Sequence, residues 1–419
     1  MQVGIDLSCW SNYRGYGRYT RNLVDALLVA GGKHSYVGFC DRVTAREGTF
    51  PSGLKLVTVA TSQAPTQAAT AYGRRRVSDM WRMAWAVFRS GVDLMFFPSS
   101  YTYFPVLPRT RCVIVVHDAI AERWPKLIFP TWTGRLAWTA KSRMAGWQAD
   151  RVITVSHNAA DAIHAHLGIS TRRLRVIYEA ADPVFRIQDA SIERERQVRE
   201  QYGIPPTARL LLYVGGFSPH KNLEALLAAF ARLVGSSAAS EPRDEGPLHL
   251  ALVGETTREA FFSCYTALCE QIGQLGLESR VTFTGFVPDA DLVQLYRTAV
   301  CLVLPSRDEG FGLPVVEAMA CGTPVVTSRG GALPELVGEA GILVDPDRTD
   351  DFADALRRVS EDVECRAELR ERGLRRASQL DWNVAAADLL RVFDELDPTA
   401  RVTAGPNPSE LSPGWREGG

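Results

Sequence analysis

The sequence of 419 residues has only eight cysteines, and no two of them form a Cys-x-x-Cys pair. They are scattered and lie mostly inside apolar segments, which excludes zinc and dithiol redox motifs and predicts buried thiols of a reducing compartment. No apolar run reaches the roughly 18 residues that indicate a membrane-spanning helix. Residues 1–6 are typical of a strand rather than of a signal peptide, so we expect a cytoplasmic protein.

The sequence also lacks an excess of charge of either sign. Lysine and arginine number 47 against 48 aspartate and glutamate residues, so no global field draws the protein to nucleic acid. No Asp-x-Asp or histidine cluster demands a metal, and we expect neither a metal nor a cofactor. The chain is longer than one ordinary core, because single cores stop growing at about 250–300 residues. We therefore expect two domains.

The order of apolar and amphipathic segments predicts an α/β fold. Apolar strands alternate with amphipathic helices in both halves of the chain, which is typical of doubly wound parallel sheets. In the first half we expect strands at 3–7, 54–59, 94–97, 112–116 and 152–155. In the second half we expect strands at 210–214, 249–253, 281–284, 300–304, 325–327 and 342–344.

The boundary between the two domains is expected between Asp182 and Pro206, where a proline is followed by a highly charged, helix-like run. This divides the chain into an N-terminal domain of residues 1–190 and a C-terminal domain of residues 191–380. The polar segment 236–246 predicts a surface insertion in the second domain.

One segment, residues 305–322 (PSRDEGFGLPVVEAMACG), predicts a phosphate-binding turn. The apolar run 300–304 before it reads as a buried parallel strand, and Pro314 suits the first position of a following helix. In such a unit the amides of Gly312 and Leu313 would point beyond the strand end, with the positive end of the helix dipole behind them. A diphosphate is the expected ligand.

Two carboxylates flank this turn, Glu309 in the loop and Glu317 in the helix. Their spacing lets Glu309 reach a polar group beyond the phosphates, while Glu317 reaches toward the opposite end. Carboxylates accept hydrogen bonds from sugar and ribose hydroxyls, and their charge favours positive charge developing at an anomeric carbon. Alternatively, Glu309 is a solvated loop residue and Glu317 only complements the helix dipole.

The segment resembles the E-x7-E signature of the retaining family 4 glycosyltransferases, which share the two-domain GT-B fold. The likeness continues through residues 330–337 (GGALPELV) and 341–346 (GILVDP), in the family's order. It implies two Rossmann-like domains that face each other across a cleft. It also implies that Glu309 contacts the transferred sugar and that Glu317 contacts the nucleotide ribose.

A second constellation, residues 214–222 (VGGFSPHKN), follows a predicted strand and opens a helix. Lys221 can place its charge on a phosphate, or it is an ordinary surface lysine that the helix dipole slightly disfavours. It matches the family's diphosphate-binding lysine. Many relatives carry arginine where this sequence has Gly216, so the site would rely on Lys221, backbone amides, and Arg307 or His220. The remaining donor-binding candidates are Gly215, Gly216, Phe311, Gly312 and Leu313.

In the N-terminal half, residues 113–118 place His117 and Asp118 at the carboxyl end of a buried strand, where open α/β sheets bind ligands. A generic histidine is more often structural, and Asp118 can instead cap the following turn. The His-Asp ending resembles that of bacterial mannosyltransferase-like members, in which this histidine lies beside the sugar. We therefore expect His117 to act catalytically together with Glu309 and Lys221.

The loop at residues 13–20 follows the first strand and opens a helix. Its glycines permit a close approach of backbone to a ligand. In the family, the matching loop faces the reaction centre from the acceptor domain, which makes Gly15, Gly17 and Arg18 candidates. Arg18 is equally well explained as a helix-surface charge.

Two expectations concern the C-terminal end of the chain. By the resemblance, the helix at 383–396 crosses back to pack on the N-terminal domain. Residues 398–419 are rich in proline, glycine and serine, so a disordered tail is expected.

Two stretches, 74–89 and 132–147, combine tryptophan with arginine or lysine, as interfacial membrane segments do. The alternative is that their apolar residues pack in the core while the arginines form a solvated face. Peripheral attachment to the inner face of the cell membrane is our hypothesis for a lipid-linked acceptor.

Together these inferences predict a retaining, metal-independent hexosyltransferase. Its substrates would be a nucleotide-sugar donor and a glycan or lipid-linked acceptor of cell-surface polysaccharide or glycolipid synthesis. The His-Asp ending and the pair Lys221 and Asn222 favour mannose, with GDP-mannose as donor. Two alternatives remain open, a sugar-nucleotide epimerase of GT-B fold and a catalytically silent sugar-nucleotide-binding protein.

Overall fold

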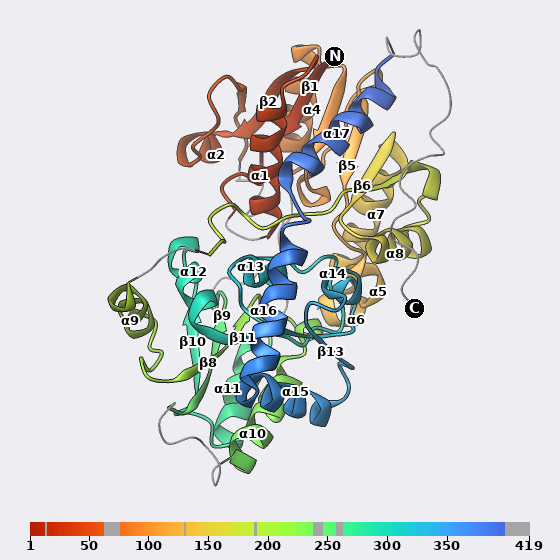
Figure 1. The fold of residues 1–419 in the computed structure, drawn as a ribbon. Coiled ribbons are helices and arrows are strands. Elements are labelled where there is room, and N and C mark those ends of the chain that lie inside the picture. The colour runs from red at the N-terminus through yellow and green to blue at the C-terminus, as the bar shows by residue number, and fades with distance from the viewer. Residues whose placement is uncertain are drawn as a thin grey trace.

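The computed structural model describes residues 1–12, 15–62, 76–129, 131–187, 191–237, 246–256 and 263–398. These residues form two α/β domains, stacked one above the other in Figure 1, each built on one parallel sheet. The predicted fold class is confirmed. Most of the expected surface insertion and nearly all of the expected tail lie outside the described residues.

The first sheet has seven strands. Their spatial order is β3 (Lys55–Val59), β2 (Ser35–Asp41), β1 (Gln2–Asp6), β4 (Leu94–Phe97), β5 (Arg111–Val115), β6 (Arg151–Thr154) and β7 (Leu174–Val176). The helices of this part of the chain are α1 (Gly15–Ala30), α2 (Arg42–Glu47), α4 (Val77–Ser90), α5 (Ile120–Arg123), α6 (Pro125–Ile128), α7 (Trp132–Gln148) and α8 (His157–Leu167).

The second sheet has six strands. Their spatial order is β10 (Val281–Gly285), β9 (Leu248–Val253), β8 (Arg209–Val214), β11 (Ala299–Leu304), β12 (Val325–Ser328) and β13 (Ile342–Val344). The helices that follow β7 are α9 (Ile192–Gln201), α10 (Leu223–Ser237), α11 (Tyr265–Gln274), α12 (Asp289–Thr298), α13 (Leu313–Ala320), α14 (Leu333–Val337), α15 (Thr349–Glu361), α16 (Val363–Ala377) and α17 (Trp382–Leu396).

Strands at the centre of each sheet are continuous apolar runs because helices cover both faces. Every residue of β9 is buried, and so is all of β8 after its first residue. The expected strands of the second half are present to within one residue at each end. In the first half, β2 and β7 were not predicted. β2 carries a glycine and ends in aspartate, whereas β7 is only three residues long with an arginine at its centre.

The last helix returns to the first domain. Figure 1 shows α17 lying beside α1, and its Leu389 and Phe393 belong to the same buried cluster as Leu23 and Leu27 of α1. The indole N–H of Trp382 donates to the carbonyl of Ala181 at 3.0 Å. The chain segment that leaves the first sheet is thereby bonded to the helix that returns to the first domain. No described helix has the length and apolar character needed to cross a membrane.

Candidate functional site

The predicted phosphate turn lies between β11 and α13. Gly312 has φ of 112°, a left-handed conformation that favours glycine, and α13 begins at the next residue. Pro314 lies in the first turn of this helix, where its missing N–H costs no helical hydrogen bond. The free amides at the start of α13 therefore lie beyond the carboxyl end of β11, as expected for an anion site.

Lys221 and Glu309 meet at the ends of neighbouring strands, β8 and β11. Lys221 ends the short helix η3 (Pro219–Lys221), and its Nζ donates to both carboxylate oxygens of Glu309, at 2.7 and 2.9 Å. Ser306 Oγ donates to the same carboxylate at 2.6 Å. Burial alone would raise the pKa of Glu309, but the charge of Lys221 and the hydrogen bonds from Lys221 and Ser306 together lower it. The site therefore favours the charged form of the Glu309 carboxylate.

Hydrogen bonds to backbone carbonyls fix the loop that follows β8 against the loop that follows β11. The N–H of Arg307 donates to the carbonyl of His220 at 2.7 Å. The side-chain amide of Asn222 donates to the carbonyls of Pro305 at 3.2 Å and Pro346 at 2.8 Å. The position of Lys221 relative to the turn is thus set by the fold rather than by its own ion pair.

This sequence has Gly216 where many relatives have arginine, and we expected His220 or Arg307 to take its place. The two residues lie in different surroundings. Arg307 forms an ion pair with Asp347 and is partly exposed. His220 is buried, and its Nδ1 has no hydrogen-bond partner among the described residues. Burial and the charge of Lys221 lower the pKa of His220 to about 3, so its imidazole is neutral. A buried ring nitrogen without a partner beside Lys221 is suited to a ligand hydrogen bond.

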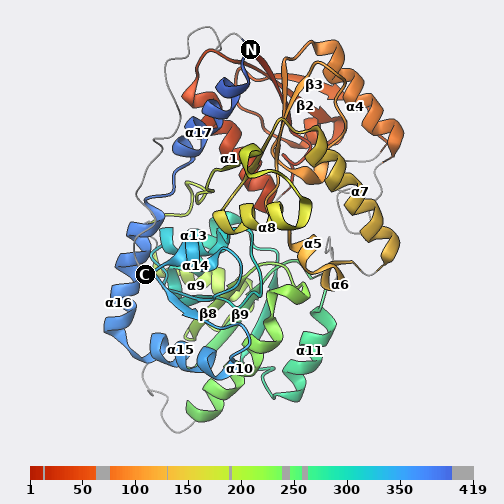
Figure 2. The ribbon, with the colours of Figure 1, turned by 90° about the vertical axis from the view of Figure 1, so that its right-hand side faces the viewer.

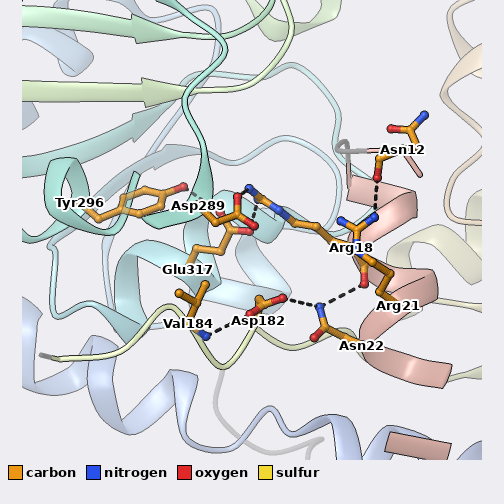
Figure 3. Close-up of polar contacts among 9 residues, drawn as sticks. All are labelled: Asn12, Arg18, Arg21, Asn22, Asp182, Val184, Asp289, Tyr296 and Glu317. Carbon is orange, nitrogen blue, oxygen red and sulfur yellow. Dashed lines mark hydrogen bonds and ion pairs between the residues drawn. The ribbon is translucent and has the colours of Figure 1, made fainter. Parts of the chain in front are cut away.

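The second glutamate of the signature is wholly buried. Glu317 accepts a hydrogen bond from Arg18 Nη1 at 2.6 Å and one from the hydroxyl of Tyr296 at 3.0 Å, as Figure 3 shows. Burial raises the pKa of Glu317, while Arg18 and Tyr296 oppose that shift. Both of its carboxylate oxygens therefore have protein partners in this structure.

Arg18 comes from α1 of the other domain and reaches across to Glu317. Its guanidinium also pairs with Asp289 and lies over the ring of Phe185, 5.2 Å from the centroid. Next to it, Asn22 donates to the carboxylate of Asp182 at 3.0 Å. Arg18 is thus an ion-paired bridge between the domains, and the interpretation as a solvated helix-surface charge is wrong.

The two candidate glycines near the start of α1 have different surroundings. A Cβ on Gly17 would overlap the carbonyl of Asn12, so only glycine fits at that position. A Cβ on Gly15 would lie 3.6 Å from the side chain of Leu313, which places the start of α1 against the start of α13. Tyr13 and Arg14, the first residues of the predicted loop, lie outside the described residues.

His117 follows β5 and uses both ring nitrogens. Nδ1 lies 3.0 Å from a carboxylate oxygen of Glu179, and Nε2 lies 3.1 Å from the carbonyl oxygen of Pro98. A carbonyl and a carboxylate only accept, so both nitrogens donate when the ring is charged. Burial lowers the pKa of His117, but the hydrogen bond to Glu179 and its charge outweigh burial and raise it. The two acceptors therefore favour the charged, imidazolium form of His117.

Raising the pH is expected to weaken this ion pair. Because folding raises the pKa of His117, the stabilisation is complete below the ordinary histidine value of about 6.5. It is lost as the pH rises through the higher pKa of the folded protein. The melting temperature, measured across this pH range, should fall more steeply for the wild type than for Glu179→Gln, which lacks the charged partner. Parallel pH profiles for the two proteins would contradict the ion pair.

Asp118 faces, from the opposite domain, the loop between β11 and α13, which we call the donor loop. Its carboxylate accepts from the N–H of Ile120 at 3.0 Å, so it does cap the following turn. Burial raises the pKa of Asp118, and the charge of Glu309 raises it further, while Lys221 opposes both. Asp118 lies next to Gly310, the residue after Glu309, since a Cβ on Gly310 would be 2.9 Å from Cβ of Asp118. It therefore belongs to the same polar centre as Lys221 and Glu309.

The two domains touch along the donor loop. A Cβ on Gly310 would overlap the carbonyl oxygen of His117 and would lie 2.9 Å from Cβ of Asp118. The carbonyl of Gly310 accepts from Ser156 Oγ at 2.7 Å. Asp308 accepts from the indole of Trp124 at 3.0 Å. This arrangement encloses the polar centre between the loops that follow β5 and β11.

Glu335 makes another contact between the domains. Its carboxylate accepts from the N–H groups of His157 and Asn158, at 2.9 and 3.0 Å, and from the hydroxyl of Tyr178 at 2.7 Å. An acid of the second domain thereby satisfies free amides at the start of α8 in the first.

Several residues of the site were not predicted from the sequence. Asp308 and Glu335 lie inside segments 305–322 and 330–337, and their position in these motifs was the only indication of a role. Glu179 follows β7, the short strand that was not predicted. Asp289 and Tyr296 lie on α12, and no pattern in the sequence pairs them with Arg18 or Glu317.

The described residues contain no group of three or more His, Cys, Asp or Glu side chains arranged to hold a metal ion. Asp289 and Asp291 are spaced as Asp-x-Asp, but both have protein partners. Asp289 pairs with Arg18, and Asp291 accepts from Arg194 and from the hydroxyl of Tyr202.

Two family models match the chain. Residues 13–185 match the model described as Glycosyltransferase Family 4, and residues 194–376 match the model described as Glycosyl transferases group 1. The two matches leave residues 1–12, 186–193 and 377–419 uncovered.

Curated relatives are similar over part of the chain. A D-inositol 3-phosphate glycosyltransferase of Rhodococcus jostii is 32% identical over 64% of this chain and 56% of its own length. The serotype-specific mannosyltransferase WbdA of Escherichia coli is 28% identical over 61% of this chain and 30% of its own length. The O-antigen chain mannosyltransferase B of Escherichia coli is 34% identical over 43% of this chain and 45% of its own length.

Solved structures share the fold over nearly the whole chain. Sucrose-phosphate synthase from Thermosynechococcus elongatus matches with a TM-score of 0.71 and 19% identity, over 94% of this chain and 99% of that one. WaaG, a glycosyltransferase involved in lipopolysaccharide biosynthesis, matches with a TM-score of 0.69 and 17% identity, over 93% and 99%. Anabaena HepE, solved with UDP and glucose, matches with a TM-score of 0.67 and 20% identity, over 94% and 100%.

Proposed function

Because the chain belongs to the family 4, group 1 glycosyltransferases and has their GT-B fold, we propose that it transfers a hexose with retention of anomeric configuration. The donor is a nucleotide-diphosphate sugar, and the acceptor is a glycan or lipid-linked molecule of cell-surface polysaccharide or glycolipid synthesis. The acceptor would be presented at the inner face of the cell membrane. The proposed reaction uses no resident metal or cofactor.

The contact between Lys221 and Glu309 carries this proposal. As the bond between the anomeric carbon and the diphosphate breaks, its electron pair goes to the leaving diphosphate, and positive charge develops on the sugar. Lys221 Nζ, held at 2.7 Å from Glu309, supplies a preorganised cation for the leaving group. The amides at the start of α13 add the donors of a helix N-terminus. The Glu309 carboxylate lies beside this cation, where it can stabilise the sugar's charge.

In a single step with retention, the acceptor oxygen attacks the face from which the diphosphate leaves, and the leaving diphosphate oxygen takes the proton of the acceptor hydroxyl. Asp118 and His117 border this centre from the first domain, so we propose that the acceptor enters along their side. His117 is hydrogen bonded at both ring nitrogens. It therefore serves the sugar through its positive charge or after exchange of one partner, rather than as a base in this protonation state.

We propose that Glu317 receives the ribose hydroxyls. Both of its oxygens are engaged here, one by Arg18 and one by Tyr296. Donor binding would therefore exchange the contact with Arg18 for one with a ribose hydroxyl. That exchange would release one contact between the two domains on nucleotide binding, since Arg18 lies on α1 and Glu317 on α13.

The sugar that we favour is mannose, with GDP-mannose as donor. The names of WbdA and of the O-antigen chain mannosyltransferase support mannose. The relatives named D-inositol 3-phosphate glycosyltransferase support a second candidate, transfer to an inositol phosphate. HepE was solved with UDP and glucose, so uridine donors form the necessary comparison.

A donor panel tests the proposal. Release of nucleotide diphosphate would be measured from GDP-mannose, UDP-glucose and UDP-N-acetylglucosamine, in EDTA, with and without a membrane lipid extract or inositol 3-phosphate. We expect release from GDP-mannose that accelerates with the lipid extract. Sugar-nucleotide conversion that needs no acceptor would indicate an epimerase, and binding without turnover would indicate a silent protein.

A further inference from the structure

Helix α4 exposes an apolar stripe to solvent. Val77, Trp81, Trp85 and Phe88 recur at helical spacing and are all exposed, with Trp81 at 60% and Trp85 at 53%. The opposite side of the helix is buried in the core through Met83 and Val87. The expectation that the apolar residues of this segment pack in the core is therefore wrong for the tryptophans.

Helix α7 exposes a second stripe of the same kind. Trp132, Leu136 and Trp147 lie at positions separated by multiples of a helical turn, and the tryptophans are 76% and 82% exposed. Met144 beside them is also exposed. Of the aromatic residues of this helix, only Trp138 is turned inward, where it donates to Glu122 at 2.7 Å.

The two stripes lie on one side of the first domain. Met83 of α4 and Ala145 of α7 belong to the same buried cluster, so both helices cover the same face of the first sheet. Figure 2 shows α4 and α7 following each other along one edge of that domain. We call the exposed apolar residues of α4 and α7, with the arginines between them, the tryptophan face.

The exposed charges of the tryptophan face are all positive. The chain as a whole carries a net charge of −1, but α7 contains no acidic residue, and α4 contains only Asp79, which is buried. Arg82 and Arg89 flank the stripe on α4, and Arg135 and Arg143 flank the one on α7. A nearly neutral protein thus gathers cations around its exposed tryptophans.

From this charge segregation we propose that the tryptophan face docks on the surface of an anionic lipid bilayer. Tryptophan prefers the headgroup region, where its ring is apolar and its N–H stays hydrated, and arginines beside it attract anionic lipids. A neutral or basic partner surface would not complement these charges. Docking needs no sugar donor, so it stands independently of the proposed transfer reaction.

Docking on this face would also place the site near the bilayer. Ile120 and Ile128, of α5 and α6, pack with Trp138 of α7 in one small buried cluster. These short helices follow His117 and Asp118 directly in the chain. The tryptophan face is therefore rigidly connected to the acceptor side of the polar centre.

Vesicle sedimentation with the full chain tests the proposal. We expect binding to phosphatidylglycerol vesicles at low salt, weakening as salt screens the arginines, and little binding to phosphatidylcholine. Trp81→Ser combined with Trp85→Ser should lower the partition coefficient at least tenfold. Each of Arg82→Ala and Arg143→Ala should lower it about fivefold.

The matched controls are Ile192→Ser and Val384→Ser, which remove exposed apolar side chains from α9 and α17. They should bind vesicles like the wild type, and circular dichroism would show that every variant is folded. Equal binding by the tryptophan variants, or no binding to phosphatidylglycerol, would overturn the proposal. So would a wild-type dimer in sedimentation equilibrium that the tryptophan variant converts to a monomer, because a second copy would then cover this face.

Discussion

Replacing Lys221 with alanine is expected to lower the turnover of the donor about 100- to 1,000-fold, the usual effect of losing one preorganised donor at a leaving group. Lys221 Nζ lies at the ends of β8 and β11, and the loops around it are joined by the contact from Arg307 N–H to the His220 carbonyl. The loss should therefore appear in kcat while the backbone of these loops stays in place. Initial rates of nucleotide release at saturating donor measure it.

The control for this variant must separate charge from folding, because Lys221→Ala leaves the Glu309 carboxylate buried without its cation. Lys221→Arg keeps the charge, and Lys221→Met with Glu309→Gln removes both charges together. We expect the double variant to recover stability in thermal unfolding while it stays inactive. A rate near that of the wild type for folded Lys221→Ala would contradict the role of Lys221.

Gly310→Ala is expected to lower kcat/KM about 100-fold, since a misplacement of about 1 Å can cost that much. The new Cβ would overlap the carbonyl oxygen of His117 and lie 2.9 Å from Cβ of Asp118. The donor loop and the His117 loop cannot then keep their present separation. Transfer kinetics with thermal unfolding would measure the effect on activity and on folding separately.

The matched control is Gly235→Ala on α10, a position with open space around an added Cβ. It should keep full activity, and a helix-interior alanine stabilises relative to glycine. If Gly310→Ala turned over donor as fast as Gly235→Ala, the close approach of the two domains would not be part of the active arrangement.

Much of the fold could be predicted because its strands are buried on both faces. β8, β9 and β11 are largely apolar runs bounded by turn residues. Such runs can be recognised from the sequence alone. β2 and β7 could not be found in this way. β2 pairs with β1 through residues that include Gly38, whose Cβ would overlap the side chain of Leu7, so its composition reflects packing rather than strand propensity.

The candidate site was predictable only as far as it follows strand ends. His117 comes directly after an apolar run, and Glu309 and Lys221 lie in loops that follow such runs, so their gathering at sheet edges follows from the α/β topology. The pairing of Arg18 with Glu317 spans 299 positions and two domains, and only the folded arrangement brings these residues together. Glu179 was missed with β7, and with it the partner that favours the charged form of His117.

Amide hydrogen exchange with and without saturating GDP, and separately UDP, most directly tests whether the nucleotide binds between these loops. We predict protection in residues 214–222 and 305–313 of the second domain, together with residues 117–124 and the start of α1, because ligand binding would hold both domains around the polar centre. Protection by either nucleotide that falls elsewhere in the chain, or no protection at saturating nucleotide, would contradict this site.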